Sequence, residues 1–226
     1  MYSLCYFALQ CVGYDISLDI SDMILHNLKK YRMLTDDNKL YVTTNLNKSL
    51  VLMYICFRFI TMAYANPKQL INQTYIPPNE FSIWKHLTSC YAMTDLVSLL
   101  KSNKMPRSTQ MHHIGVVLAY IIIMNSDINK INMAKSLCLY GGYSSIPFLV
   151  NIYLALRKIT NKTYTLKKLA AITYIMGCSV NWSWQFYYQY NYFNPLTFKT
   201  LVYSLFSSGL LCSWIQDDII LIKHLI

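Results

Sequence analysis

The sequence carries little charge: only 13% of its 226 residues are Asp, Glu, Lys or Arg, whereas a soluble domain averages about 25%. Apolar residues make up 54% of the chain, too many for one packed core surrounded by water. Glycine and proline number six each, which excludes collagen-like and linker-like chains, and the high apolar content excludes intrinsic disorder. A membrane is therefore the first candidate for the solvent around this protein.

Acidic residues are also scarce, since 10 Asp and Glu stand against 20 Lys and Arg and leave a net charge of +10. The basic residues fall in short clusters between apolar stretches, as in the loops of a multi-spanning membrane protein, so no nucleic-acid partner is expected. The seven cysteines are scattered without a C-x-x-C motif, which predicts neither a disulfide framework nor a zinc site. No metal or other cofactor is expected.

Long apolar stretches predict the membrane spans. A bilayer core about 30 Å thick needs roughly 20 helical residues. The apolar run 1–12 is shorter than this and is followed by acidic residues, so it is a seventh span or an interfacial anchor rather than a cleaved signal. Six other stretches meet or approach the length, the third being extended back toward Arg107: residues 49–65, 83–100, 111–125, 133–156, 169–188 and 196–215.

The orientation of these spans follows from the basic residues. Most Lys and Arg fall on the loops of one side, and the positive-inside rule then places that side and the C-terminus in the cytosol. Among the N-x-S/T sequons, the one at Asn72 lies in a predicted lumenal loop and is the candidate for glycosylation.

Ionisable residues inside spans are costly and are functional hypotheses by default. Counting from the nearest basic loop residues places Asp95, His112 and His113 at one level of a helical hairpin, about 9 Å inside the cytosolic boundary, and Asn151 at the same depth. A histidine oriented by Asp95 could take a proton from an amine or hydroxyl while an acyl donor approaches. The alternative is a buried polar network that only fixes helix packing.

Other polar positions have two interpretations each. Arg58 lies near mid-bilayer, where an unpaired guanidinium costs at least about 2.5 kcal/mol, so it needs an acidic or carbonyl partner or binds a lipid phosphate. Asp217 and Asp218 follow the last predicted span and are interpreted as solvated. Gly141 and Gly142 in the fourth span favour close helix packing or a bend.

From Asn45 onward the order of motifs resembles the TLC domain family, named for a translocon-associated protein, the longevity-assurance (ceramide synthase) proteins and a neuronal lipofuscinosis protein. The resemblance covers about four fifths of the chain. It is carried by the opening of the first span and by one segment in each of the next three spans: residues 45–49, 90–96 (CYAMTDL), 111–114 (MHHI) and 144–151 (SSIPFLVN).

The resemblance implies a multi-pass helical bundle, usually in the endoplasmic reticulum, that acts in lipid synthesis, transport or sensing. Ceramide synthases of the family N-acylate sphingoid bases with acyl-CoA, and their signature couples a histidine pair to a downstream His-Asp. His112 and His113 match the first element, but residues 136–140 (SLCLY) contain no His or Asp, and Tyr143 and Ser144 stand where the family commonly has an acid. These departures favour the plain TLC type.

The sequence thus predicts an all-α, multi-pass transmembrane bundle with six to seven spans. Residues 1–44 form an N-terminal segment and 45–226 the TLC-like domain. The expected function is membrane lipid homeostasis, with membrane lipids as partners and Arg58 and Asn151 as candidate ligand-binding residues. One alternative is an acyl-CoA-dependent acyltransferase with His112, His113 and Asp95 as catalytic residues. Another is a structural or trafficking protein without a ligand.

Overall fold

The computed structural model describes residues 4–65, 67, 78–102, 104–125, 132–192 and 198–226. Within these residues the secondary structure is helical, without strands, which confirms the predicted all-α class. The helices are α1 (Leu4–Leu25), α2 (Lys29–Arg32), α3 (Asp36–Ala65), α5 (Pro78–Lys101), α6 (Arg107–Met124), α7 (Asn132–Ser145), α8 (Leu149–Ile159), α9 (Tyr164–Tyr192) and α10 (Phe198–Leu225).

Charged residues and prolines explain several helix ends. Asp36 and Asp37 occupy the first turn of α3, where the positive end of the helix dipole stabilises a carboxylate. Lys101 lies in the last turn of α5, at the negative end of that helix. Pro78 begins α5, and Pro106 precedes α6, positions where the missing N–H of proline costs no helical hydrogen bond.

A bend divides the fourth predicted span, residues 133–156, into two helices. α7 and α8 meet at an angle of 43°, and Pro147 lies in the turn between them. The bend therefore lies at the proline, which removes a helical hydrogen bond, and not at Gly141 or Gly142. Gly177 of α9 faces this turn: a Cβ at Gly177 would lie 3.2 Å from Cδ of Pro147, so the glycine allows α9 to approach the bend closely.

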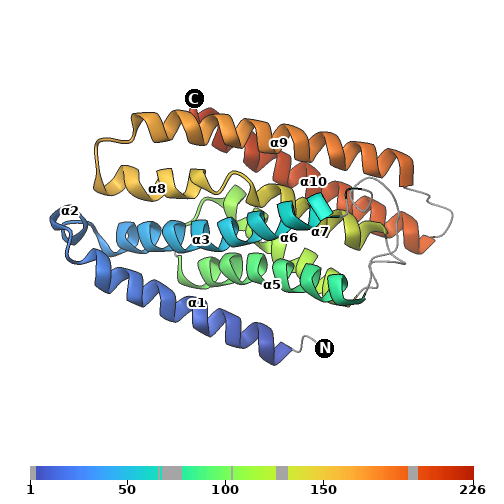
Figure 1. Ribbon diagram of the computed structural model, residues 1–226, viewed down its shortest axis with the longest axis horizontal. Coiled ribbons are helices and arrows are strands. Elements are labelled where there is room, and N and C mark those ends of the chain that lie inside the picture. Colours follow the sequence, from blue (N-terminus) through green and yellow to red (C-terminus); the bar gives the residue numbers. More distant parts are fainter. Residues whose placement is uncertain (1–3, 66, 68–77, 103, 126–131, 193–197) are drawn as a thin grey trace.

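The long helices run roughly along one axis of the molecule (Figure 1). α3 packs against α1, α5, α7 and α8, whereas α10 packs against α6, α7 and α9. A large apolar core fills the space between α3, α5, α6, α7 and α10, with Phe59, Trp84, Tyr120, Leu137 and Trp214 among its buried side chains. The N-terminal run is part of a longer helix, α1, which lies along α3 and α5.

Fewer helices qualify as membrane spans than the six to seven expected. By length and composition, two helical segments of the described chain are long and apolar enough to cross a membrane, within Asp36–Ala65 and Leu205–Leu225, and the bent pair α7 and α8 raises the number to three if it counts as one span. The physical reason is that the other long helices mix polar side chains with apolar ones. In α5, for example, Ser89, Thr94, Asp95 and Ser98 are buried inside the bundle.

The outer surface of several helices is apolar. On α1 and α3, large side chains that are about half exposed or more recur at helical spacing. They include Leu9, Val12, Ile16 and Ile20 on α1 and Leu50, Tyr54, Phe57 and Ile60 on α3. Outward apolar faces beside inward polar residues are the arrangement that a lipid environment favours.

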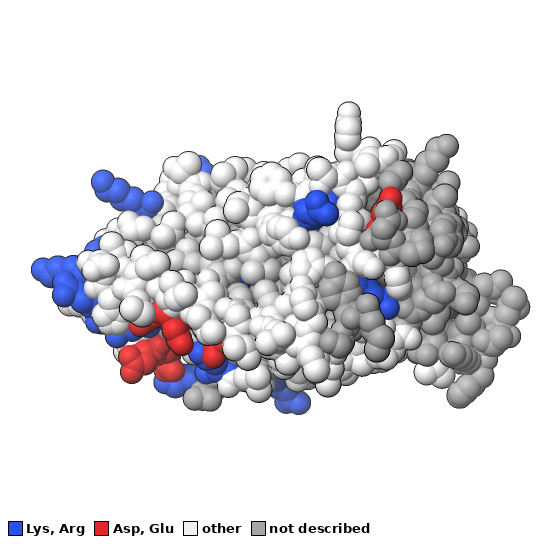
Figure 2. Space-filling model, turned by 60° about the horizontal axis from the view of Figure 1, so that its bottom comes forward, with Lys and Arg blue, Asp and Glu red and all other residues white. Residues whose placement is uncertain are grey.

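Charged residues gather at one end of the bundle. Nζ of Lys30 donates to Oδ1 of Asn161 over 3.2 Å and Nζ of Lys167 to the carbonyl of Ile226 over 3.3 Å, so α2, the α8–α9 link and the C-terminus of α10 meet there. Figure 2 shows most of the blue and red side chains toward that end, beside a broad white surface. We refer to it as the basic end; it carries Lys29, Lys30, Arg32, Lys101, Lys104, Arg157, Lys158, Lys162 and Lys167.

Candidate functional site

A cavity of about 840 Å³ lies between α3, α5, α6, α8, α9 and α10. We refer to it as the large cavity. Its volume falls in the range of pockets that hold small molecules, about 300–1,000 Å³. Exposed lining residues, including Thr35, Lys104, Lys158 and His224, belong to the basic end, so the cavity opens there.

Ionisable side chains meet at the inner part of the large cavity. Asp95 is fully buried, and its Oδ1 lies 2.8 Å from Nδ1 of His113 and also pairs with Nζ of Lys48. Nδ1 of His112 lies 3.5 Å from Oδ2 of Asp217. We refer to Lys48, Asp95, His112, His113 and Asp217 as the ionisable cluster. The structure thus brings together the three residues that the sequence places at one depth.

The two adjacent histidines face different carboxylates. Their rings are nearly perpendicular, with centroids 5.7 Å apart, because successive residues of a helix point about 100° apart. His113 faces Asp95 of α5, whereas His112 faces Asp217 of α10. Nε1 of Trp214 donates to the backbone carbonyl of His112 over 3.4 Å, which joins α10 to α6 at this level. Only one of the two histidines can use Asp95 as its orienting group.

The interpretation of Asp217 and Asp218 as solvated residues is wrong. α10 continues to Leu225, so both aspartates lie inside it and line the large cavity. Asp218 is buried and accepts hydrogen bonds from the hydroxyl of Tyr174 over 2.6 Å and from Nε1 of Trp182 over 3.0 Å. The hydroxyl of Tyr140 approaches the same carboxylate at 3.5 Å. Asp218 therefore ties α7, α9 and α10 together.

Lys48 is the member of the cluster that sequence reasoning missed. Lysines between apolar stretches usually mark loops, but α3 begins at Asp36 and places Lys48 well inside a helix. A signal is present: Tyr41, Asn45, Lys48 and Leu52 follow one another at spacings of four, three and four, which puts them on one helical face. All four line the large cavity.

The remaining candidate residues fall in different places. Asn151 lines the large cavity, as a ligand-binding role requires. Arg58 is exposed on α3 and lines neither this cavity nor the smaller one described below. Among the described residues, no carboxylate lies within ion-pair distance of Arg58. Asn72 lies outside the described residues.

Basic side chains line the opening of the large cavity. Arg157 contacts His224 and donates from Nη2 to the hydroxyl of Tyr41 over 3.1 Å. Nζ of Lys104 lies 2.5 Å from Oδ2 of Asp37, and this hydrogen bond and its charge attraction raise the pKa of Lys104 above its usual value. We refer to Lys101, Lys104, Arg157, Lys158 and His224 as the basic mouth; all five line the cavity.

The chemistry of the site is that of ion pairs and hydrogen bonds. The cluster combines one lysine and two histidines with two carboxylates, so it can hold a polar group and move a proton. Across the described part of the chain, no three His, Cys, Asp or Glu side chains are arranged to hold a metal ion. Comparison with protein-family models, curated proteins and solved structures finds no significant match to this chain.

Proposed function

We propose that this chain is a multi-pass membrane protein that binds an amphipathic lipid with an anionic head group in the large cavity, and that it acts in membrane lipid homeostasis. The observation that supports the proposal is a gradient of polarity along the bundle axis. Basic residues surround the opening, the ionisable cluster lies deeper, and apolar residues follow beyond it.

The gradient is clearest on α5. Thr88, Tyr91, Asp95, Ser98 and Lys101 recur every three or four residues and so share one face of the helix. From Thr88 to Lys101 this face extends about 20 Å at 1.5 Å per residue, and it changes from apolar surroundings to the basic mouth. An amphiphile lying along this face would place its head near Lys101 and its tail near Thr88.

The same order occurs on α3 and α6. On α3 the sequence of lining residues from the basic end inward is Tyr41, Lys48, Leu52 and Ile55. On α6 it is Thr109, His112, His113, Val116 and Ala119. Three helices with the same gradient favour one elongated ligand with a polar head and an apolar tail. A compact polar metabolite would leave the apolar part unused.

The membrane topology belongs to this proposal. Six to seven spans, with α1 as the additional one, would align the outward apolar faces with lipid and bring the basic end to one surface. The positive-inside rule places the basic end and the C-terminus in the cytosol. The resemblance to plain TLC proteins supports an endoplasmic reticulum membrane. Glycosylation reporters inserted near Asn72 and after Asn161 test this orientation. If only the reporter after Asn161 is modified, the orientation is the opposite of the proposed one.

The lipid-binding proposal can be tested with a single-chain phospholipid. The full chain, purified in mild detergent, is expected to co-purify with lipid detectable by mass spectrometry and to bind lysophosphatidate. Replacing two mouth lysines, Lys104→Ala with Lys158→Ala, should weaken lysophosphatidate binding about 5- to 10-fold, because each charge attracts the anionic head group through a partly screened interaction. Binding should also weaken as salt rises.

A matched control removes two charges elsewhere. Lys162 and Lys168 are exposed at the same end but do not line the large cavity. The variant Lys162→Ala with Lys168→Ala should change binding less than about twofold. Equal losses in both double variants would mean that lysophosphatidate is attracted by net charge alone, and absence of both co-purified lipid and binding would refute the proposal.

A second candidate function is acyl transfer, which the 2.8 Å contact between Asp95 and His113 favours. His113 would take the proton of a substrate amine while the nitrogen attacks the carbonyl of an acyl-CoA thioester; the N–C bond forms, the C–S bond breaks, and the thiolate leaves and is protonated. Asp95→Asn and His113→Ala should then abolish a lipid product even after activity is normalised to the amount of folded protein. Unchanged lipid profiles in both variants would exclude this function.

A further inference from the structure

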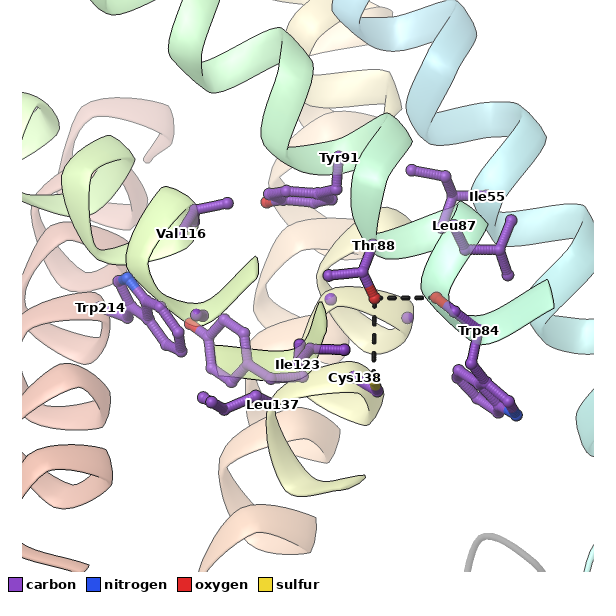
Figure 3. Close-up of a pocket in the computed structure, with 14 residues that line it drawn as sticks. Ile55, Trp84, Leu87, Thr88, Tyr91, Val116, Ile123, Leu137, Cys138 and Trp214 are labelled. Carbon is purple, nitrogen blue, oxygen red and sulfur yellow. Dashed lines mark hydrogen bonds between the residues drawn. The ribbon is translucent and has the colours of Figure 1, made fainter. Parts of the chain in front are cut away.

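A second cavity, of about 30 Å³, lies deeper in the bundle (Figure 3). We refer to it as the small cavity. Helices α3, α5, α6, α7 and α10 each contribute to its wall. In Figure 3, Tyr91 lies across the top of the space, Val116 and Trp214 on one side, and Ile123 and Leu137 below. Its size suits the terminal methyl group of a chain.

Few polar side chains line this wall, and two of them donate their hydrogen atoms to backbone carbonyls. Oγ1 of Thr88 donates to the carbonyl of Trp84 over 2.9 Å and approaches Sγ of Cys138 at 3.7 Å, as the dashed lines in Figure 3 mark. Nε1 of Trp214 donates to the carbonyl of His112. Nε1 of Trp84 is buried without a hydrogen-bond partner, but in Figure 3 it points away from the space. An ordered water makes two to four hydrogen bonds, and this mostly apolar wall offers few groups for them, so the small cavity suits a hydrocarbon group better than water.

Tyr91 separates the two cavities. It is the residue of α5 that lines both of them, and Nζ of Lys48 in the ionisable cluster lies 5.6 Å from the centre of its ring. Its neighbours along the same helical face are Thr88 in the small cavity and Asp95 in the cluster. A chain that extends from one space into the other must therefore pass the Tyr91 side chain.

We propose that the small cavity receives the end of the lipid's apolar chain, and that Gly141 limits the length of chain that the protein accepts. This inference rests on the proposed lipid-binding function. The chain would enter from the large cavity past Tyr91 and end against α7. Gly141 has the required position, because it lines the small cavity and a Cβ built there would meet no atom within 4 Å.

The next glycine, Gly142, has a different structural role. A Cβ at Gly142 would lie 2.4 Å from Cδ2 of Phe59, so Gly142 is needed for the approach of α3 to α7. Gly141 is under no such packing constraint, and alanine would favour the helix there because glycine is a poor helix former. Packing against a neighbouring helix therefore does not require a glycine at position 141.

The test measures chain-length preference. The unaltered full chain in detergent is titrated with a homologous series of saturated lysophosphatidates that lengthens one methylene at a time. Affinity should rise about fourfold per methylene until the chain end fills the small cavity and then level off. In Gly141→Ala the rise should stop one to two carbons earlier, and the longest well-bound lysophosphatidate should bind about 4- to 15-fold more weakly than it does to the unaltered protein.

A second variant shrinks the same space from another helix. Ala119 of α6 is buried and lines the small cavity, so Ala119→Val should also shorten the preferred chain. The control is Gly209→Ala, a helical glycine with nothing within 4 Å of its Cβ that lines neither cavity. Its length profile should match that of the unaltered chain.

The outcomes separate this inference from the proposed function. Binding with an unchanged length profile in both Gly141→Ala and Ala119→Val overturns the inference and leaves lipid binding intact. An equal shift in Gly209→Ala also overturns it, because the effect would then come from helix stiffening. Failure of every lysophosphatidate to bind the unaltered chain overturns the proposed function and the inference together.

Discussion

The large and small cavities lie on one axis yet are built on opposite principles. The wall of the large cavity holds ionisable side chains whose charges are compensated, such as Lys48 and His113, which both pair with the buried Asp95. The wall of the small cavity is mostly hydrocarbon and is shaped by close contacts such as that of Gly142 with Phe59. We therefore expect charge balance to dominate the stability of the wall of the large cavity, and steric fit to dominate that of the wall of the small cavity.

This difference also explains how such a polar site can be stable inside an apolar bundle. An isolated charge in a low-dielectric environment is strongly unfavourable, whereas a cluster of opposite charges with hydrogen-bond partners is tolerated. Asp95 is fully buried and Lys48 has a side chain only 13% exposed, so each depends on the other. The apolar wall of the small cavity needs no such charge compensation and requires only a good steric fit.

The largest effect is expected from removing one charge of the cluster. Asp95→Ala leaves Lys48 and His113 without their carboxylate, and it should lower the free energy of unfolding by about 3–5 kcal/mol. Thermal unfolding in detergent, followed by tryptophan fluorescence, measures the change. The control is Asp36→Ala: Asp36 is fully exposed, so its helix-dipole contribution and its ion pair with Lys39 are screened by water, and the effect should be much smaller than that of Asp95→Ala.

A compensating variant shows whether charge is the cause. Lys48→Met combined with Asp95→Ala removes both partners and should recover a large part of the loss, since no buried lysine is left without a carboxylate. If the double variant is as unstable as the sum of the single ones, the two residues act independently and the cluster is not held together by charge balance.

The next effect is steric and belongs to the small cavity. Gly142→Ala forces a methyl group into the ring of Phe59 and should lower the free energy of unfolding by about 1–3 kcal/mol. Gly141→Ala, one residue earlier, should be neutral or slightly stabilising. Adding Phe59→Leu to Gly142→Ala should relieve part of the clash. A loss of similar size at Gly141 would show that helix bending, not contact with Phe59, sets the requirement.

Much of the site is predictable from the sequence where the helices are adjacent in the chain. Asp95, His112 and His113 lie on a hairpin with a short link, so counting residues from Lys101 and Arg107 gives their depth. The same counting fails for Asp218, because neither a glycine nor a proline marks the end of α10 and the predicted span stops ten residues too early. The error removed the carboxylates of α10 from the predicted site.

Other features depend on tertiary structure. The all-α class follows from composition, but the contact between Lys48 and Asp95 joins residues 47 positions apart and needs the packing of α3 on α5. The large cavity lies between six helices and the small cavity has walls from five, and no local pattern specifies their volumes. Buried polar residues also lower the mean hydropathy of helices such as α5, which is not among the candidate spans of the described chain.

A smaller effect is expected where one donor of several is removed. Tyr174→Phe deletes the 2.6 Å hydrogen bond to Asp218 but leaves that of Trp182, so the free energy of unfolding should fall by about 0.5–1.5 kcal/mol. Tyr164→Phe is the matched control, since Tyr164 is 70% exposed. A loss as large as that of Asp95→Ala would place the main electrostatic constraint at Asp218 instead of the cluster.

The smallest effect on stability is expected at the basic mouth. Lys104 has a side chain that is 79% exposed, and its ion pair with Asp37 is screened by water and salt, so Lys104→Ala should leave the unfolding midpoint unchanged. Lysophosphatidate binding should nevertheless weaken about two- to threefold at low salt, and this difference should vanish at high salt. A lysine of the basic mouth that affects binding without affecting stability would have a different role from that of the buried ions, which stabilise the fold. If instead Lys104→Ala lowers the midpoint as Asp95→Ala does, the charges of the mouth serve the fold, and the case for a ligand head group at that position is lost.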